Sequence, residues 1–354
     1  MKIRVDNYLK ITKDDKQMPK LLSAQSSYGY DRALIWWLFG MVGLVAIMVV
    51  IGGVTRLTGS GLSMVEWRPI IGILPPLTEV EWMRVFNLYQ ASPEFQQVNM
   101  DMNLAEFKVI FFWEYVHRVW GRLLGLAFGL PLLFFWLAGR IPQGYGLPLL
   151  GLLALGSVQG IIGWWMVTSG LVDNPAVSQY RLAIHLSMAL LILLLLLWTA
   201  LNLRFGRSKR PSGRAAATLL LVALTIIAGA FVAGMDAGLL YNEYPLMGDG
   251  LVPVEYGENG LSDPFDNPAT AQFHHRWIAV LAVLAVADLW VSGLRKGLGG
   301  LVHIMAVSVI IQFLLGLTTL LLGVPVWAGA LHQAGAVLLL SIVLIVTHRL
   351  QAQQ

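Results

Sequence analysis

Eight long apolar runs constrain this chain more than any other feature of its sequence. Each is long enough to cross a bilayer as a helix, which takes about 17 to 25 residues. Because a backbone in lipid must satisfy its own hydrogen bonds, the runs predict helices, and their continuity argues against alternating barrel strands. We expect spans near residues 33–54, 109–138, 146–167, 182–203, 215–236, 273–293, 301–322 and 329–347.

The composition agrees with an integral membrane protein. Apolar residues make up 57% of the chain and charged residues only 12%, whereas a soluble domain carries about a quarter charged residues. There is no cysteine, which excludes disulfides, thiolate metal sites and cysteine nucleophiles. The first 32 residues are polar and carry no signal-peptide pattern, so they are expected to form an N-terminal tail.

The distribution of positive charge predicts the orientation. Lys and Arg gather in the tail 1–32, the linker 204–214 and the tail 349–354, whereas loop 237–272 has none and is acidic. By the positive-inside rule, both termini face the cytoplasm and the loops 55–107 and 237–272 face outward. We therefore expect a multi-pass protein of a bacterial inner membrane, or of the mitochondrial inner membrane. Its basic residues serve topology and need no nucleic acid.

The two halves of the chain repeat weakly, in the same order. The matched pairs are 52–62 with 229–239, 114–118 with 272–276, 159–171 with 312–324, and His185 with His332. Four spans per half return the chain to its starting side, so both halves have one orientation. The prediction is an all-α integral membrane protein with two pseudo-symmetric four-helix bundles, 33–203 and 215–348, related by an axis along the membrane normal.

Four histidines lie inside predicted spans, one on each even-numbered span: His117, His185, His275 and His332. At about 1.5 Å per residue, all four lie about 25 to 32 Å from the cytoplasmic helix end, near the outward face. A lone histidine in a membrane usually makes a helix–helix hydrogen bond, but two per bundle at one depth favour axial ligands of haem iron. We choose His275 over its neighbour His274 because a His–Arg pair then recurs in both halves.

Charged side chains beside these histidines suggest a polar haem edge. Arg118, Arg122 and Arg276 can each bind a haem propionate, since an Arg fork matches a carboxylate. Two other histidines, His303 and His348, lie near the cytoplasmic ends, where we expect them to be interfacial.

Glu114 makes the two predicted sites unequal. It precedes His117 by one turn and shares its helix face, whereas the matching residue of the second half is Gln272. An ionisable group within a membrane indicates function, so one half is expected to do chemistry and the other to hold a permanent haem. The alternative is that Glu114 only pairs with Arg118 or Lys108.

These residues resemble heme A synthase. The shared motifs are GGxTRLTGSGLSM at 52–64, ExxHR at 114–118, HisArg at 275–276 and LHQ at 331–333, and the similarity runs from about residue 33 to 348. The lack of cysteine resembles the long subclass of mitochondria and many Gram-negative bacteria. Whether the motif at 55–69 closes over a substrate or caps the bundle stays open.

The resemblance implies an oxidoreductase that oxidises the C8 methyl group of heme O to a formyl group, giving heme A for cytochrome oxidase. It implies a haem b held by His275 and His332 in the C-terminal half, and a substrate site with His117, His185 and catalytic Glu114 in the N-terminal half. The implied partners are heme O synthase, an electron-transfer partner and cytochrome oxidase assembly factors, in the lipid bilayer, with the oligomeric state open.

Two rival functions use the same residues differently. A di-haem b electron-transfer protein linked to quinone would use the same histidines and keep two b haems, but it would give Glu114 no particular role. A transporter with parallel repeats would need broken helices or charges near the membrane midplane. The bound haems distinguish the first rival from a synthase.

Overall fold

The computed structural model describes residues 31–66, 73–172, 175–208 and 211–352. The predicted N-terminal tail up to residue 30 therefore lies outside the described residues, as do Trp67 and Arg68 of the loop motif and Lys209 and Arg210 of the linker.

All eight predicted spans are confirmed as helices that are long and apolar enough to cross a membrane. They are α2 (Arg32–Leu57), α5 (Leu104–Leu137), α6 (Gly146–Val167), α7 (Gln179–Phe205), α8 (Gly213–Gly234), α10 (Pro268–Arg295), α11 (Gly299–Leu321) and α12 (Val326–Ala352). The largest shifts are of five residues: α12 ends five residues after its predicted span, α10 begins five residues before its own, and α5 likewise begins five residues early. A capping box explains this start, because Asn103 and Glu106 satisfy each other's backbone amides there.

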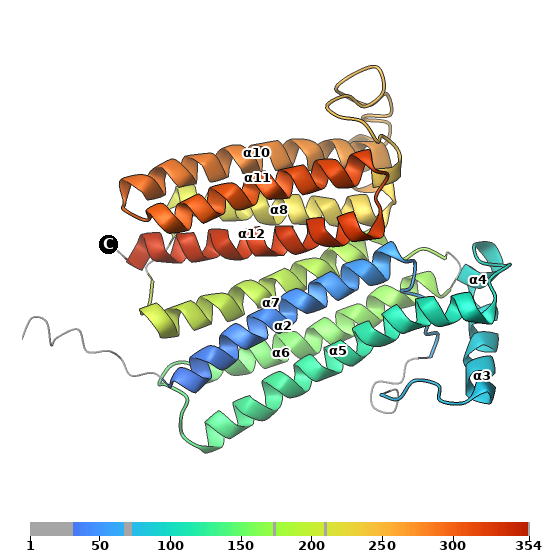
Figure 1. Cartoon of the computed structure of the whole chain (residues 1–354), viewed down its shortest axis with the longest axis horizontal. Helices are drawn as coiled ribbons and strands as arrows, with labels where there is room; N and C mark the ends of the chain where they lie inside the picture. Colours follow the sequence, from blue (N-terminus) through green and yellow to red (C-terminus); the bar gives the residue numbers. More distant parts are fainter. Residues whose placement is uncertain (1–30, 67–72, 173–174, 209–210, 353–354) are drawn as a thin grey trace, which may run out of the picture.

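The helices pack in two groups (Figure 1). We call α2, α5, α6 and α7 the N-terminal group and α8, α10, α11 and α12 the C-terminal group. They meet where α12 packs on α2 and α7, and where α7 packs on α8. Leu193 of α7 and Leu340 of α12 are fully buried in the apolar core shared by the two groups. The symmetry axis between the groups stays a prediction.

Both long connections lie at the same end of the helices, which we call the loop side (Figure 1). The first contains α3 (Glu79–Gln90) and α4 (Pro93–Gln97), and the second contains η2 (Ala237–Leu239), η3 (Gly260–Ser262) and α9 (Asp263–Asp266). The α3 helix is held on the start of α5, where Tyr89 stacks on Phe107 with ring centroids 5.0 Å apart. A short helix, η1 (Thr168–Gly170), extends α6 on the same side.

One ion pair bridges the two groups at the loop side. Arg56, in the last turn of α2, lies 2.9 Å from Asp236, which follows α8. Both side chains are partly exposed, so this pair contributes only about 0 to 1 kcal/mol. Apolar packing, rather than this pair, therefore holds the groups together.

Candidate functional site

The four candidate histidines all sit near the loop-side ends of their helices. His185 and His332 each lie six residues after the first residue of α7 and α12, and His275 lies seven after the start of α10. His117 lies deeper along α5 because that helix projects beyond the others, and Leu137, the last residue of α5, lies 20 residues after it. The common depth predicted for them is therefore consistent with the helix boundaries.

In the C-terminal group, His275 and His332 face each other. Their ring centroids are 6.4 Å apart and their planes are nearly perpendicular, at 86°. A bond from imidazole to a first-row metal is about 2 Å long, so two rings that share one metal atom have centres about 6 Å apart. The spacing therefore fits a single iron atom between the two rings.

Hydrogen bonds orient both of these rings. Nδ1 of His275 lies 3.0 Å from the carbonyl of Thr225 in α8. Because a carbonyl only accepts, Nδ1 must carry the proton, which leaves Nε2 free to bind a metal. The amide of Gln312 in α11 lies 3.1 Å from Nδ1 of His332 and donates to the His332 carbonyl at 2.9 Å.

In the N-terminal group, His117 of α5 and His185 of α7 are both partly buried. Gln159 of α6 donates to the carbonyl of His185 at 3.0 Å, the same contact that Gln312 makes with His332. Within the described part of the chain, Nδ1 of His117 and of His185 is buried without a hydrogen-bond partner. Such orphaned nitrogens fit a site that is completed by a bound group.

A glycine of a neighbouring helix makes room for each of the four rings. A methyl group placed on these glycines would come within 2.7 to 3.1 Å of Cε1 of the histidine. The pairs are Gly52 with His117, Gly163 with His185, Gly229 with His275, and Gly316 with His332. Any larger residue would push the ring away, so these positions need glycine for close approach. The same contact occurs in both halves, between the helices that the sequence repeat matches.

Glu114 is buried and fully hydrogen-bonded. The Ser63 hydroxyl donates to its Oε2 at 2.7 Å and the Met64 amide does so at 2.6 Å, while Arg118 donates to Oε1 at 2.5 Å. Of the two partners considered from the sequence, Arg118 therefore pairs with Glu114, and Lys108 instead lies 5.0 Å from the ring centroid of Trp82. These three hydrogen bonds hold the carboxylate in a fixed position.

Arg118 extends this contact to the loop motif. It donates to the carbonyls of Met64 at 2.8 Å and Glu66 at 3.1 Å. Leu62 is buried and would touch any side chain at Gly170, the end of η1. The described part of the motif therefore caps the loop-side end of the N-terminal group.

The second half makes an equivalent contact, in which Gln272 donates hydrogen bonds to the connection whereas Glu114 accepts them. Gln272 donates to the carbonyls of Ala237 and Tyr241 at 3.1 and 3.2 Å. Arg276 donates to the Gln272 side chain at 3.1 Å and to the carbonyls of Tyr241 and Leu246 at 2.8 and 3.0 Å. In each half, two polar side chains one helical turn apart on a span therefore bind the long connection by hydrogen bonds. Only the first half places a negative charge there.

Of the remaining predicted residues, Arg122 lies one turn after Arg118 in α5 and is partly buried. His274 turns to the second connection, where its Nε2 lies 3.3 Å from the Tyr256 hydroxyl. His303 accepts a hydrogen bond of 3.2 Å from Trp290 at the end opposite the loop side.

His348 does not lie at the membrane surface as expected. It is fully buried between α12 and α7, with Nε2 3.0 Å from the Asn202 side chain and its ring against Trp198. The two groups of helices meet there, so its neighbours replace the expected interfacial environment.

Sequence analysis missed a buried carboxyl group in the first connection. Glu94 is 8% exposed and accepts a hydrogen bond of 3.0 Å from Tyr89, which in turn accepts one of 2.8 Å from Asn99. Burial raises the pKa of Glu94 to about 7, and the nearby charge of Glu114 acts in the same direction. The sequence SPEFQQ indicates only a capped helix start, so it gives no sign of this burial.

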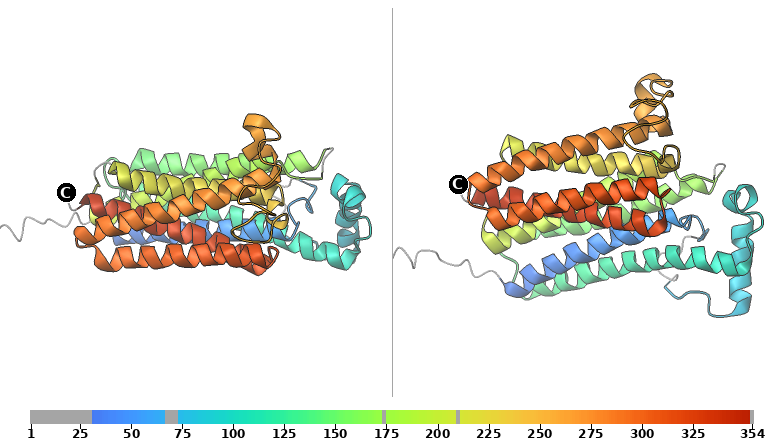
Figure 2. Two further views of the ribbon diagram at one scale, coloured as in Figure 1. Left: turned by 90° about the horizontal axis from the view of Figure 1, so that it is seen from above. Right: turned by 45° about the horizontal axis from the view of Figure 1, so that its top comes forward.

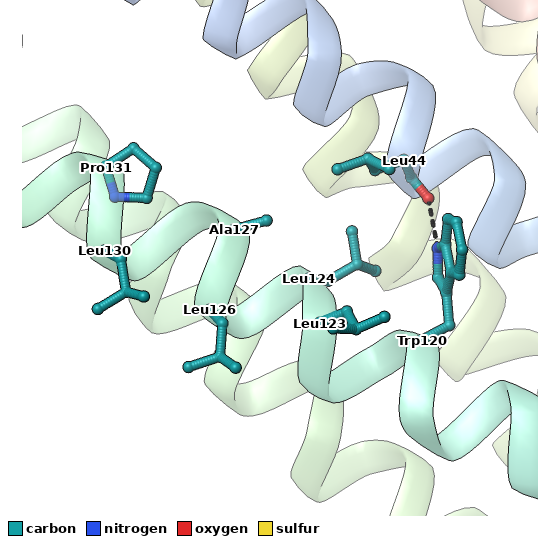
Figure 3. A pocket seen from close by; sticks show the side chains of 8 residues that line it. All are labelled: Leu44, Trp120, Leu123, Leu124, Leu126, Ala127, Leu130 and Pro131. Carbon is teal, nitrogen blue, oxygen red and sulfur yellow. Dashed lines mark hydrogen bonds between the residues drawn. The ribbon is translucent and has the colours of Figure 1, made fainter.

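An apolar groove of about 350 Å³ runs along the lipid-facing side of α5 next to α2. At one end, Trp120 donates a hydrogen bond of 3.0 Å to the carbonyl of Leu44 (Figure 3). Leu123, Leu126 and Leu130 line it and are at least half exposed. The groove therefore lies outside the helix group, and its shape and apolarity suit a lipid chain.

Comparison with known proteins shows the family. The family model described as "Cytochrome oxidase assembly protein", COX15-CtaA, matches residues 35–344. A heme A synthase of Parvibaculum lavamentivorans is 43% identical over 344 residues, which cover 94% of this chain and 98% of that protein. A heme A synthase of Beijerinckia indica is 48% identical over 330 residues, covering 87% of this chain and 90% of that protein.

Proposed function

The chain belongs to the COX15-CtaA family of cytochrome oxidase assembly proteins, whose matched relatives are heme A synthases, and we propose that its two histidine pairs serve two different haems. It is a membrane-embedded oxidoreductase that converts heme O to heme A. The observation that carries the proposal is the pairing of His275 with His332 across 6.4 Å, together with the glycine contact that both pairs share.

His275 and His332 hold a resident haem b in the C-terminal group. The bare Nε2 of His275 and the spacing of the two rings support this assignment. When bound, haem b supplies one-electron redox chemistry. The chain positions the two ligands through the Thr225 carbonyl of α8, which accepts from Nδ1 of His275, and through Gln312 of α11, which donates to the backbone carbonyl of His332, so rigid helices rather than loops set their geometry.

His117 and His185 hold the substrate, heme O, in the N-terminal group. The glycine contact that these two rings share with the C-terminal pair supports this placement. With water as the source of the formyl oxygen, oxidation of a methyl group to a formyl group removes four electrons and releases four protons. Positive charge therefore develops near the reacting methyl group, and a buried anion on that side lowers its energy.

Glu114 provides this anion. Its three donors keep both carboxylate oxygens occupied, so we assign it electrostatic stabilisation rather than proton abstraction. The matching Gln272 carries no charge, which supports placing the chemistry in the N-terminal group. Arg118, Arg122 and Arg276 are our candidates for the propionate groups, although Arg118 and Arg276 also hold loop carbonyls.

The membrane, the orientation and the partners are inferred from the sequence. We place the loop side on the outer face of a bacterial inner membrane, or its mitochondrial counterpart, with both termini on the other face. Heme O synthase would supply the apolar substrate, an electron-transfer partner would take up the electrons, and cytochrome oxidase assembly factors would receive heme A.

Identification of the bound haems tests the proposal. The full-length protein, purified with and without co-expressed heme O synthase, is examined by pyridine hemochrome spectra and by chromatography of extracted haem. We expect haem b in both preparations and heme O or heme A only with the synthase. His275→Ala should lose haem b, whereas His117→Ala should keep haem b and lose heme O and heme A. Two b haems with the synthase present would contradict the assignment of the N-terminal group.

A further inference from the structure

Several exposed apolar side chains of the first connection gather on one short stretch, while Val98 and Met100, 64% and 65% exposed, lie further along it. Ile73, Leu74 and Leu77 are 52%, 72% and 75% exposed, and Val80 at the start of α3 is 80% exposed. Contiguous exposed apolar residues mark an interaction surface rather than ordinary solvent contact. The question is what covers Ile73–Leu77.

A hydrogen bond fixes the height of this stretch relative to the spans. The hydroxyl of Tyr115 in α5 donates to the carbonyl of Ile73 at 2.6 Å. Tyr115 lies 22 residues before Leu137, the last residue of α5, which is about 33 Å at 1.5 Å per residue. The hydrocarbon core is about 30 Å thick, so Ile73 lies where hydrocarbon meets the lipid head groups.

The lipid-facing side of α5 continues up to the same level. Leu130, Leu126 and Leu123 are at least half exposed on one side of the helix, and Phe112 and Val109 continue that side at 53% and 59% exposure. If the exposed apolar side of α5 ended at the edge of the hydrocarbon core, it would stop near Tyr115. Because it continues to Val109, the surroundings of α5 stay apolar past that edge, next to the Ile73–Leu77 stretch.

The α3 helix lies across the spans rather than along them. Figures 1 and 2 show it beside the loop-side end of α5, running at a steep angle to that helix in each view. Its Trp82 packs on Phe111 of α5 with ring centroids 5.1 Å apart, and the ammonium group of Lys108 lies 5.0 Å from the Trp82 ring. Trp, Tyr and Lys are the side chains that anchor proteins at a membrane interface.

We propose that Ile73, Leu74 and Leu77 insert into the head-group region of the loop-side leaflet, so that α3 rests on the membrane surface as an interfacial helix. The lipid surface is the partner of this stretch. The anchor fixes the height of the first connection, and with it the cap made by residues 63–66 over the N-terminal group. This inference requires only that the helices span a membrane, so it stands independently of the haem assignments.

Site-directed labelling tests the proposal cleanly because the chain has no cysteine. Single variants Leu74→Cys and Leu77→Cys receive a nitroxide label, and the full-length protein is placed in lipid nanodiscs. Collisions with oxygen, which concentrates in lipid, are compared with collisions with a water-soluble nickel chelate. Leu130→Cys on the lipid-facing side of α5 is the lipid control. Leu261→Cys, 98% exposed in the second connection, is the water control.

At positions 74 and 77, we expect an oxygen-to-nickel ratio several-fold above that at 261 and on the lipid side of the range. A ratio equal to that at 261 would overturn the proposal, because the stretch would then stand in water. Protection from both probes would also overturn it, because protein rather than lipid would cover the surface. An unchanged absorption spectrum of the bound haem checks that each variant folds.

Discussion

Gln333 of α12 donates a hydrogen bond of 2.9 Å to the backbone carbonyl of Val49 in α2. Gln333 directly follows His332, and Val49 lies one turn before Gly52, which makes room for His117. The same turn of α2 therefore contacts the residue next to His332 in the C-terminal group and makes room for His117 in the N-terminal group. This turn joins the two groups at the level where the proposal places their haems.

Gly53→Ala should damage this junction. A methyl group there would overlap the side-chain amide of Gln333, which must turn away and give up its hydrogen bond to Val49, at a cost of about 1 to 3 kcal/mol. We expect a lower unfolding temperature and a shifted reduction potential of haem b, measured by thermal unfolding and redox titration. Gly43→Ala in the same helix is the matched control, since nothing lies within 4 Å of the added methyl group. Equal unfolding temperatures and equal reduction potentials in the two variants would show that the position of α12 does not depend on this contact.

Gly316→Ala should displace the ring of His332, because the added methyl group would lie 2.7 Å from its Cε1. We expect the haem b absorbance of the purified protein to fall or its bands to shift, while Gly300→Ala in α11 leaves them unchanged. Reduced-minus-oxidised spectra measure the outcome. A wild-type spectrum from Gly316→Ala would argue against His332 as a ligand.

Glu114→Gln should leave haem b in place and halt the enzyme before the aldehyde. An amide can accept from Ser63 and keeps much of the packing, but it removes the negative charge that faces Arg118. Losing a preorganised charge of this kind lowers the rate by about 100- to 1,000-fold. Chromatography of extracted haem should show heme O or a partly oxidised product. Normal heme A yield would remove Glu114 from the mechanism.

Glu94→Gln should abolish a pH dependence of stability. The pKa of Glu94 is raised in the fold from 4.5 to about 7, so the folded state favours the protonated acid. Stability is therefore greatest below pH 4.5 and falls as the pH rises to about 7, by at most about 3 kcal/mol. The amide mimics the neutral acid, so the variant should resist proteolysis of the first connection better than wild type at pH 8 and equally at pH 4.5. The exposed Glu79→Gln is the control.

Much of this molecule could be predicted from local patterns. The eight spans follow from run lengths, and the shared depth of the four histidines follows from counting residues along straight helices. The start of α5 at Leu104 was missed because a polar capping box, rather than apolar sequence, determines it.

Side-chain partners could not be predicted in this way. Nothing in the order of residues shows that Glu94 is buried or that His348 pairs with Asn202. Each depends on how two distant segments are packed against one another. For Glu114, helix periodicity favours Arg118, four residues away, over Lys108, six residues away, but its contacts with Ser63 and Met64 come from another segment.

The sequence by itself determined that this chain is a bundle of membrane-spanning helices with histidines at one level, because hydropathy and helical rise are properties of each segment alone. Tertiary structure decided that the ring of His275 lies beside that of His332, whereas His274 turns to the second connection. Those outcomes depend on the rotation and crossing of neighbouring helices. That geometry is set by close contacts such as Gly53 against Gln333, which no single segment contains.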